Sequence, residues 1–316
     1  MAVFFTEDEV TDLLSMHDAV DVVEDAFRQL AEGNAVNRPR SRVHVPGTTL
    51  HVMPAGSKEW GMLGLKAYIT TRSGARFLFH LYGIDGELLA LMEADKLGQM
   101  RTGAASGVAT RFMAREDAVT VGLYGTGWQA CSQLEAVARA RTLRRAVVFG
   151  RDAVRRTRFC EKMSELLSLD VRPANSPEKV SEEADILITA TNSKEPVLRG
   201  EWLRPGQHIN AIGANVANKQ EIDSDVVRKA TRIATDSKEQ ALLECGDLIA
   251  PNAAGDLDWD DVVELADIVS GKLTGREDAT DITLFESQGL AIEDVAVGRK
   301  VYELGRARGM GAQLPF

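Results

Sequence analysis

The sequence predicts an α/β protein with two domains: a Rossmann-type, doubly wound parallel sheet, and an N-terminal α+β domain that the last helix completes. Three observations predict this. Short β-branched runs alternate with helical or polar segments after residue 118, which is typical of βαβ units. β-type runs joined by turns fill residues 40–94 and indicate an antiparallel sheet. The length of 316 residues suits two domains.

Two helices are predicted at the start of the chain. Thr6 with Glu9, and Ser15 with Asp18, have the spacing of capping boxes, in which a hydroxyl and a carboxylate satisfy the first backbone N–H groups. Apolar residues recur at helical spacing over residues 19–30. The chain therefore begins with helices that have one buried face.

The antiparallel sheet is predicted from five runs, at residues 43–45, 50–53, 64–69, 77–82 and 88–92. Asp85-Gly86 separates the last two runs and predicts a hairpin turn. Residues 95–113 have a helical pattern rich in small residues, which suits a buried helix at a domain junction. A further helical pattern, over 289–308, is expected to cross back to this sheet.

The parallel sheet is predicted from the apolar runs at residues 119–124, 146–149, 186–191, 208–213 and 232–236. We expect one domain to comprise residues 116–288, and the other to comprise residues 1–115 with 289–316.

The glycine turn after the first of these runs predicts a dinucleotide site. Gly125-Thr126-Gly127-Trp128-Gln129-Ala130 has the spacing G-x-G-x-x-A between a strand and a helix. Gly125 allows the turn, Gly127 allows a pyrophosphate to approach the backbone, and Ala130 allows helix and strand to pack closely. The amides at the helix N-terminus then face the phosphates. We expect Gly125, Thr126, Gly127, Trp128 and Gln129 to contact a nicotinamide dinucleotide, which indicates hydride transfer.

The end of the second parallel strand favours NADP(H) over NAD(H). A fold that prefers NAD carries an acidic residue there, about 20 residues after the glycines, which binds the ribose hydroxyls. Here that place holds Gly150 followed by Arg151, with Arg155 one helical turn further on. Arginines suit a 2′-phosphate, so these three residues are expected at the coenzyme. Asp152 keeps NAD(H) open, because a shift of one residue would restore the acid.

Composition argues against other classes of partner. The net charge of −10 repels polyanions, so no nucleic acid is expected. No apolar run reaches membrane-spanning length, and the N-terminus is acidic rather than signal-like. Cys131, Cys160 and Cys245 form no C-x-x-C pattern, and the five histidines have no metal-ligand spacing. We therefore expect a cytoplasmic protein with reduced thiols and no metal site.

Several segments together resemble one family over nearly the whole chain. They are Val-Met-Pro-Ala (52–55), Leu-Lys (65–66), Arg-Thr-Gly-Ala-Ala-Ser (101–106), Gly-Thr-Gly-Trp-Gln-Ala (125–130), Asn-Ala-Ile-Gly-Ala (210–214), Asp-Ser-Lys-Glu (236–239) and Gly-Leu-Ala-Ile-Glu-Asp (289–294). The chain resembles the ornithine cyclodeaminase/μ-crystallin family, which contains ornithine and lysine cyclodeaminases, an archaeal type of alanine dehydrogenase, and imino acid and ketimine reductases. The resemblance implies a homodimer formed through the N-terminal sheet, and a substrate-binding role for the domain that contains it.

The resemblance implies that Arg42, Lys66 and Arg101 bind the carboxylate of a small imino or amino acid. Arginine grips a carboxylate with two donors, and lysine supplies a compact charge. Lys66 lies in an otherwise apolar strand, where a charge is costly unless it is paired with an anion. The alternative is that Lys66 points outward from an edge strand and that Arg42 is a surface residue. We expect Met53 and Gln288 to line the same site.

Further coenzyme contacts are expected at the carboxyl ends of strands, where α/β sheets bind ligands. These are Thr191, Asn192 and Gly213. The resemblance adds Arg101, Thr102, Lys219, Ser287 and Gly289 to the expected coenzyme contacts.

Asn215 departs from the family pattern. The matching position carries an aspartate in cyclodeaminases and in the archaeal alanine dehydrogenase, whereas the ketimine-reducing branch also lacks it. Asparagine forms hydrogen bonds but does not titrate, and loss of a general acid or base typically costs about 10²–10⁴ in rate.

With Lys66 and Asn215 as catalytic candidates, the sequence favours an NAD(P)H-dependent oxidoreductase that acts on the CH–N bond of an imino or amino acid. This interpretation covers an imino acid or ketimine reductase and an amino acid dehydrogenase. An ornithine cyclodeaminase and a non-enzymatic, NADPH-binding μ-crystallin-like protein stay open as alternatives.

Overall fold

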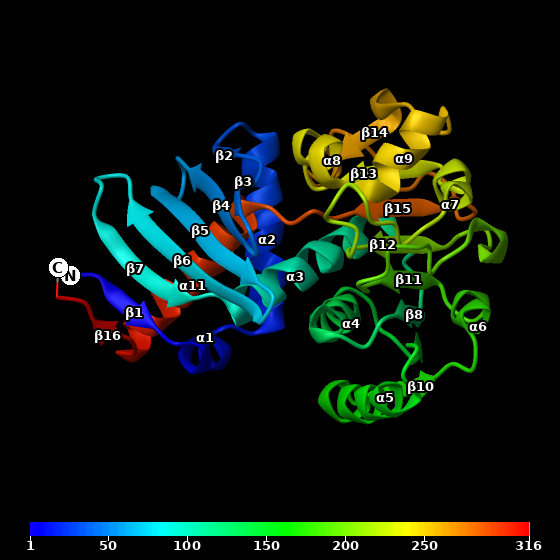
Figure 1. Ribbon diagram of the computed structural model, residues 1–316, viewed down its shortest axis with the longest axis horizontal. Helices are drawn as coiled ribbons and strands as arrows, with labels where there is room; N and C mark the ends of the chain where they lie inside the picture. Colours follow the sequence, from blue (N-terminus) through cyan, green and yellow to red (C-terminus); the bar gives the residue numbers. More distant parts are fainter. Residues whose placement is uncertain (316) are drawn as a thin grey trace. The chain divides into compact units, whose positions relative to one another are not determined.

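The computed structural model of the protein describes residues 1–315, which fall into two compact units (Figure 1). Residues 1–104, with those from Gly289 onward, form the first, here called the mixed-sheet unit. Residues 105–288 form the second, the parallel-sheet unit. Helix α3 (Asp95–Met113) contributes to both, so the division at residue 115 expected from the sequence stays a prediction.

The mixed-sheet unit is built on a sheet with the strand order β16-β1-β7-β6-β5-β4-β2, in which β3 also pairs with β4. Its strands are β1 (Val3–Phe5), β2 (Ala35–Asn37), β3 (Ser41–Val45), β4 (Thr48–Ser57), β5 (Met62–Thr71), β6 (Gly74–Gly83), β7 (Leu88–Glu93) and β16 (Ala312–Gln313). Strands β3 to β7 pair antiparallel, as predicted. Strand β1, however, pairs parallel with β7, and at three residues it is too short for its sequence to show alternation.

Three helices complete this unit: α1 (Glu7–Leu13), α2 (Met16–Ala31) and α11 (Ala291–Arg308). The Thr6 capping box at α1 is confirmed, and the Ser15 side chain accepts a hydrogen bond from the Asp18 amide at α2. Helix α11 packs on β4, β5 and β6 and against α2 (Figure 1), which confirms that the last helix completes the N-terminal fold.

The parallel-sheet unit contains a sheet with the order β10-β9-β8-β11-β12-β15-β13-β14, and every pair in it is parallel. Its strands are β8 (Thr120–Tyr124), β9 (Arg145–Phe149), β10 (Asp170–Pro173), β11 (Ile186–Thr189), β12 (His208–Ala211), β13 (Arg232–Thr235), β14 (Val262–Glu264) and β15 (Thr283–Glu286). The predicted Rossmann-type sheet is therefore confirmed. Strands β10, β14 and β15 lie outside the apolar runs because each is at most four residues long and includes a charged side chain.

Helices cover both faces of the parallel sheet, which explains why its strands appear in the sequence as continuous apolar runs. In β11, Ile186 and Ile188 pack on one face with α4 (Trp128–Ala140) and α5 (Ala153–Leu167). Leu187 packs on the opposite face. The helices on that face include α6 (Pro177–Glu182), α7 (Ser224–Lys229), α8 (Lys238–Glu244) and α9 (Gly246–Ala254). Helix α10 (Leu265–Val269) follows β14.

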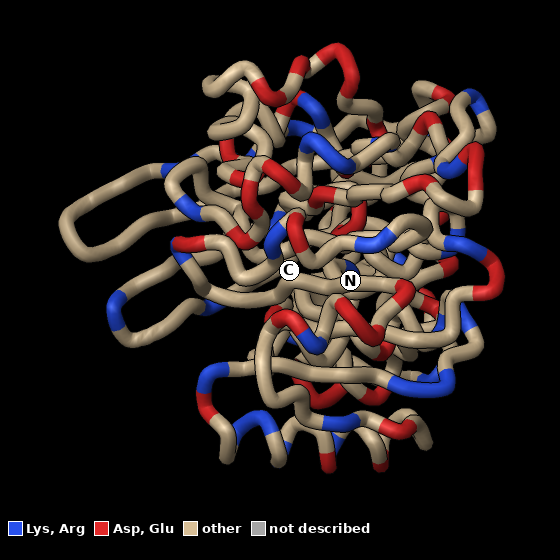
Figure 2. Tube along the Cα trace, turned by 90° about the vertical axis from the view of Figure 1, so that its right-hand side faces the viewer, with Lys and Arg blue, Asp and Glu red and all other residues tan. Residues whose placement is uncertain are grey.

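Basic and acidic residues are interspersed along the chain (Figure 2). The net charge is −10. Within residues 1–315, no helix has the length and apolar character needed to cross a membrane.

Candidate active site

The glycine turn joins β8 to α4 and leaves room for a ligand at the helix N-terminus. Gly125 has φ +117°, and a Cβ atom there would lie 2.3 Å from the Ala190 carbonyl oxygen, so only glycine fits. Gly127 is the N-cap of α4 and makes no side-chain cap. A Cβ at Gly127 would meet nothing within 4 Å. The open space in front of uncapped amides fits a phosphate group, because the helix N-terminus carries partial positive charge.

Two adjoining pockets, of about 250 and 220 Å³, border this turn and share Gly127, Ala190, Thr191 and Asn192. They lie at the carboxyl ends of β8 and β11, where the strand order reverses and where α/β sheets bind ligands. Their lining includes the predicted residues Gly125, Thr126, Gly127, Trp128, Gln129, Gly150, Arg151, Arg155, Thr191, Asn192, Gly213, Asn215 and Lys219.

The segment after β9 presents two arginines to the first pocket, Arg151 from the loop and Arg155 from the first turn of α5. Asp152 also lines it, but its Oδ1 accepts a hydrogen bond from the Arg155 amide at 3.0 Å and so caps α5. Arg156 turns back, donating to the Gly150 carbonyl oxygen at 2.7 Å, with its guanidinium 5.5 Å from the Phe149 ring centre. Arg151 and Arg155 are the exposed cations of this lining.

Glu221 is a residue of this site that the sequence did not reveal. Its buried carboxylate accepts hydrogen bonds from the Thr191 amide at 2.5 Å and the Gly213 amide at 2.7 Å, and so joins the loops after β11 and β12. A Cβ at Gly213 would lie 2.5 Å from the Glu221 Cδ, which explains the glycine. Burial raises the pKa of Glu221. In the sequence this glutamate stands in a polar stretch and looks like a surface residue.

Ser287 and Gln288 are held by a second buried carboxylate. Asp236 Oδ2 accepts hydrogen bonds from the Ser287 hydroxyl at 3.0 Å and the Gln288 amide at 2.8 Å. Asp236 Oδ1 accepts one from the Ser237 amide at 2.8 Å. The expected coenzyme contact of Ser287 and substrate contact of Gln288 stay predictions.

In the mixed-sheet unit, Lys66 lies in a row of buried side chains. Cross-strand pairing aligns Met53, Lys66, Phe79 and Met92 across β4 to β7, and each of them is at most 2% exposed. Strand β5 is internal, with β4 and β6 on its two sides. The alternative that Lys66 points outward from an edge strand is therefore wrong.

Two cations and two carboxylates form a buried cluster around Lys66. The Lys66 Nζ lies 2.8 Å from Asp294 Oδ1 and 2.7 Å from Oδ2. The Arg101 Nε donates to Asp294 Oδ1 at 3.1 Å, and its Nη1 donates to Glu293 Oε2 at 3.0 Å. All four side chains are less than a tenth exposed. The structure thus brings Lys66 and Arg101 together, as expected for a shared carboxylate site.

Glu293 and Asp294 are further residues of the cluster to which the sequence assigned no role. They lie in the first turn of α11, where the helix dipole favours carboxylates. The available signal was two adjacent acids within the apolar start of a helical pattern, a place where charge is costly without partners.

The surroundings of Lys66 change its proton affinity. Burial and the nearby Arg101 charge lower the pKa of Lys66 to about 7, while the Asp294 carboxylate acts in the opposite direction. Lys66 therefore changes its charge in the neutral pH range.

Gly289 allows Arg101 to reach its position. It has φ +78°, and a Cβ atom there would lie 2.1 Å from the Arg101 Nη1. Thr102, the next residue of α3, donates its hydroxyl hydrogen bond to the Gly98 carbonyl oxygen at 2.8 Å. The expected coenzyme contacts of Gly289 and Thr102 stay predictions.

Arg42 starts a second row on the same sheet face as Lys66. It pairs with His51, which pairs with Tyr68, which in turn pairs with Phe77. This row lies two residues along the strands from the Met53–Lys66 pair, so its side chains share that face. The His51 and Tyr68 rings stack with centres 4.2 Å apart. Burial and the charges of Arg40 and Arg42 lower the pKa of His51 to about 4, so it is neutral at pH 7.

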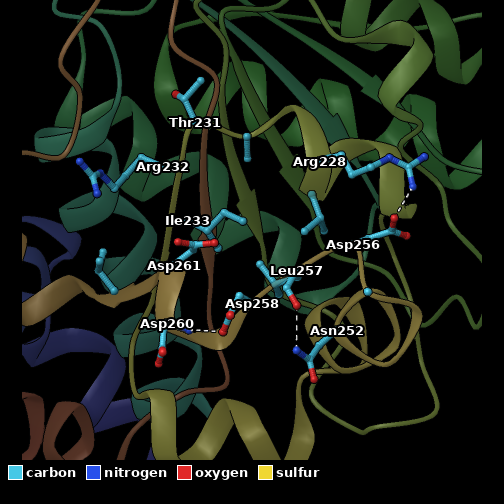
Figure 3. Close-up of a pocket in the computed structure, with 14 residues that line it drawn as sticks. Arg228, Thr231, Arg232, Ile233, Asn252, Asp256, Leu257, Asp258, Asp260 and Asp261 are labelled. Atoms are coloured by element: carbon cyan, nitrogen blue, oxygen red, sulfur yellow. Dashed lines mark hydrogen bonds and ion pairs between the residues drawn. The ribbon is translucent and has the colours of Figure 1, made fainter.

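A larger cavity, of about 880 Å³, opens at the amino ends of β13 and β14 (Figure 3). Its arginines are paired with acids: Arg228 with Asp256 at 2.7 Å, and Arg232 with Glu277 at 2.9 Å. Its lining contains none of the predicted site residues, and it lies at the edge opposite to the one where α/β sheets bind ligands.

Known proteins are similar to this chain over most of its length. A Δ1-pyrroline-2-carboxylate reductase of Bacillus cereus is 40% identical over 233 residues, covering 73% of this chain and 71% of that protein. The Thermococcus litoralis Δ1-pyrroline-2-carboxylate reductase, solved with NADH and L-proline, matches with a TM-score of 0.95 and 36% identity, over 99% of this chain and all of that one.

An archaeal alanine dehydrogenase, solved as a dimer with bound NAD, matches with a TM-score of 0.94 and 33% identity, over all of this chain and 99% of that one. Residues 2–309 match the ornithine cyclodeaminase/mu-crystallin family. The chain belongs to the ornithine cyclodeaminase/mu-crystallin family.

Proposed function

We propose that the protein is an NAD(P)-dependent oxidoreductase that interconverts a small imino acid and its amino acid. The observation that carries the proposal is the buried pair Lys66 and Arg101, in a chain whose other unit holds an open glycine turn at a helix N-terminus. Relatives solved with NADH and L-proline, and with NAD, support it.

In this proposal the two cations of the buried cluster bind the substrate carboxylate. Arg101 offers a planar set of donors and Lys66 a compact charge, and both are fixed by Asp294 before substrate arrives. The nicotinamide, when bound, supplies or accepts the hydride. Fixing a small substrate by its carboxylate lowers the barrier mainly through orientation, an effect that reaches about 7–11 kcal/mol in well-oriented intramolecular reactions.

Asn215 favours imine reduction over cyclodeamination. It lines the pocket beside Gly127 and Lys219, where its amide can donate and accept hydrogen bonds. Because an amide does not titrate, it cannot move the protons that ring closure and ammonia loss need, whereas an imine can arrive already protonated. Ornithine cyclodeamination is therefore the weaker candidate.

For the coenzyme, we favour NADP(H). Arg151 and Arg155 supply positive charge at the end of β9, and the Asp152 carboxylate already caps α5. An arginine there accommodates a 2′-phosphate. Since the relatives' complexes contain NADH or NAD, both coenzymes belong in the test.

We also propose a homodimer formed through the outer face of the mixed sheet. Val43, Leu50 and Ile69 are paired across β3, β4 and β5 on the face opposite to Lys66, and they are 57%, 36% and 44% exposed. A contiguous apolar row of this kind marks an interaction site. The alanine dehydrogenase relative was solved as a dimer.

The test follows absorbance at 340 nm with NADPH or NADH and three substrate sets: Δ1-pyrroline-2-carboxylate, pyruvate with ammonia, and ornithine with NAD. Coenzyme oxidation with either imine source supports the proposal, and ammonia release from ornithine alone would replace it with cyclodeamination. Lys66→Met is the matched control, because it keeps the volume and apolar surroundings of the row but lacks the charge. Tight coenzyme binding without turnover of any substrate would indicate a non-enzymatic binding protein.

A further inference from the structure

In the buried cluster, the charges of the two acids balance those of the two cations. Lys66 and Arg101 carry two positive charges, and Glu293 and Asp294 carry two negative charges, all within hydrogen-bonding distance of a partner in the cluster. A buried ion is stable only when it is paired and hydrogen-bonded. Without the acids, the buried charges of Lys66 on β5 and Arg101 on α3 would have no counter-charge in the cluster.

The two acids make different contacts with the cations. Asp294 contacts both cations, and its two oxygens together hold the Lys66 Nζ. Glu293 contacts Arg101 through Oε2, which also accepts a hydrogen bond from the Leu290 amide at 3.2 Å. Glu293 therefore ties Arg101 to the start of α11.

We propose that Asp294 and Glu293 are positioning residues of the substrate-carboxylate site: Asp294 keeps Lys66 charged and in place, and Glu293 holds the Arg101 guanidinium. The proposal rests on the proposed function. Neither acid is assigned a contact with substrate. Their effect passes through the two cations.

The charged groups around Lys66 come from several elements. Asp294 and Glu293 come from α11, Arg101 from α3, and Arg40 from the segment before β3. His51 of β4 shares the sheet face and is neutral at pH 7. Lys66's other neighbours in its row are apolar. Because Arg101 and Arg40 both lower the pKa of Lys66, Asp294 is the group that opposes them.

The first experiment measures Lys66 directly and does not depend on turnover. Protein that carries 13Cε-labelled lysine is titrated by NMR in the presence of NADPH, and the Lys66 signal is identified by its absence in Lys66→Met. In the wild type we expect a midpoint near neutral pH. Asp294→Asn, which removes the charge at nearly constant shape, should lower the midpoint by one pH unit or more. Asp294→Glu should restore it to within about half a pH unit of the wild-type value.

The second experiment is the pH profile of kcat/KM with the best imino acid substrate. Asp294→Asn should move the alkaline limb to lower pH, and activity above the limb falls about tenfold for every pH unit by which the limb moves. Glu293→Gln is the matched control. It should lower kcat/KM without moving the limb, because arginine does not lose its proton in this range.

A Lys66 midpoint that Asp294→Asn leaves unchanged would overturn the proposal. So would a limb that moves equally in Glu293→Gln and Asp294→Asn. If Asp294→Asn fails to fold, as judged by circular dichroism, the wild-type and Asp294→Glu titrations decide. If the wild type turns over no substrate, the proposed function fails, and the NMR titration still judges the role of Asp294.

Discussion

The charge balance of the buried cluster predicts that Lys66 and Asp294 are strongly coupled in stability. Lys66→Met leaves two carboxylates facing Arg101, and Asp294→Leu leaves two cations facing Glu293. Each single variant therefore has one uncompensated charge in a buried cluster. The double variant retains the neutral Arg101–Glu293 pair, and its two new side chains are apolar.

The size of the effect follows from the burial of the pair. Removing one partner of a buried ion pair costs about 3–5 kcal/mol, whereas replacing both with apolar residues is often neutral or stabilising by about 1–4 kcal/mol. At pH 7 both single variants should lose less than the first range, because Lys66, whose pKa is about 7, carries its charge in only about half of the molecules. The double variant should match or exceed the wild type, so the coupling energy should be at least about 1 kcal/mol.

Lys66 also makes the stability of the folded protein depend on pH. The folded-state pKa of Lys66, about 7, is below its unfolded value of 10.5, so the unfolded chain binds more protons between these limits. The stability of the wild type should therefore rise with pH across this window, relative to Lys66→Met, by about 1.4 kcal/mol per pH unit.

Hydrogen exchange of amides in β5 and α11, at pH 7 and pH 8, measures these differences in the unit that contains the cluster. Additive single effects, with the double variant as unstable as their sum to within about 0.5 kcal/mol, would refute the reasoning. A wild-type advantage over Lys66→Met that is the same at both pH values would refute the assigned pKa direction.

Three further predictions concern other parts of the molecule. Gly289→Ala should lower kcat/KM by about 10²-fold, because a Cβ at φ +78° displaces Arg101; steady-state kinetics measures this. Arg151→Ala and Arg155→Ala should each reduce the ratio of kcat/KM for NADPH to that for NADH about tenfold, and an unchanged ratio in both would contradict the 2′-phosphate assignment. Ile69→Lys, on the outer sheet face, should convert the proposed homodimer to a monomer in light scattering, and a persistent dimer would point to another interface.

The sequence predicts the fold well because the spacing of apolar residues along most elements reflects which of their faces are buried. Residues 119–124 and 186–191 appear as continuous apolar runs since helices cover both faces of their sheet. The helical pattern over residues 95–113 predicts α3 at its observed bounds. The parallel pairing of β1 with β7 is not predictable in this way, because three residues carry no register information.

The candidate site is predictable only in part, and the residues that the sequence does not identify are buried acids. Motifs identify the residues expected at a ligand: the glycine turn, the arginines after β9, and a lysine in an apolar strand. They do not identify Glu221, because an acidic residue in a polar stretch looks like a solvated one. For Glu293 and Asp294 the signal is weak: two adjacent acids at the apolar start of a helical pattern. The burial of these acids depends on partners far away in the chain, which no local pattern encodes.

These buried acids hold groups that would otherwise be free to move. Glu221 joins two backbone amides of the loops that border the coenzyme pockets, and Asp294 joins two cations. In the buried cluster, the acids have an electrostatic effect as well as a geometric one. With Lys66 protonated the four side chains sum to zero charge, so a substrate carboxylate brings a further negative charge, and this favours the charged form of Lys66. With a pKa of Lys66 near 7, carboxylate binding and protonation of Lys66 then reinforce each other in the neutral pH range. The negative charge of Asp294 keeps the pKa of Lys66 near 7, and the negative charge of a bound substrate carboxylate raises it further.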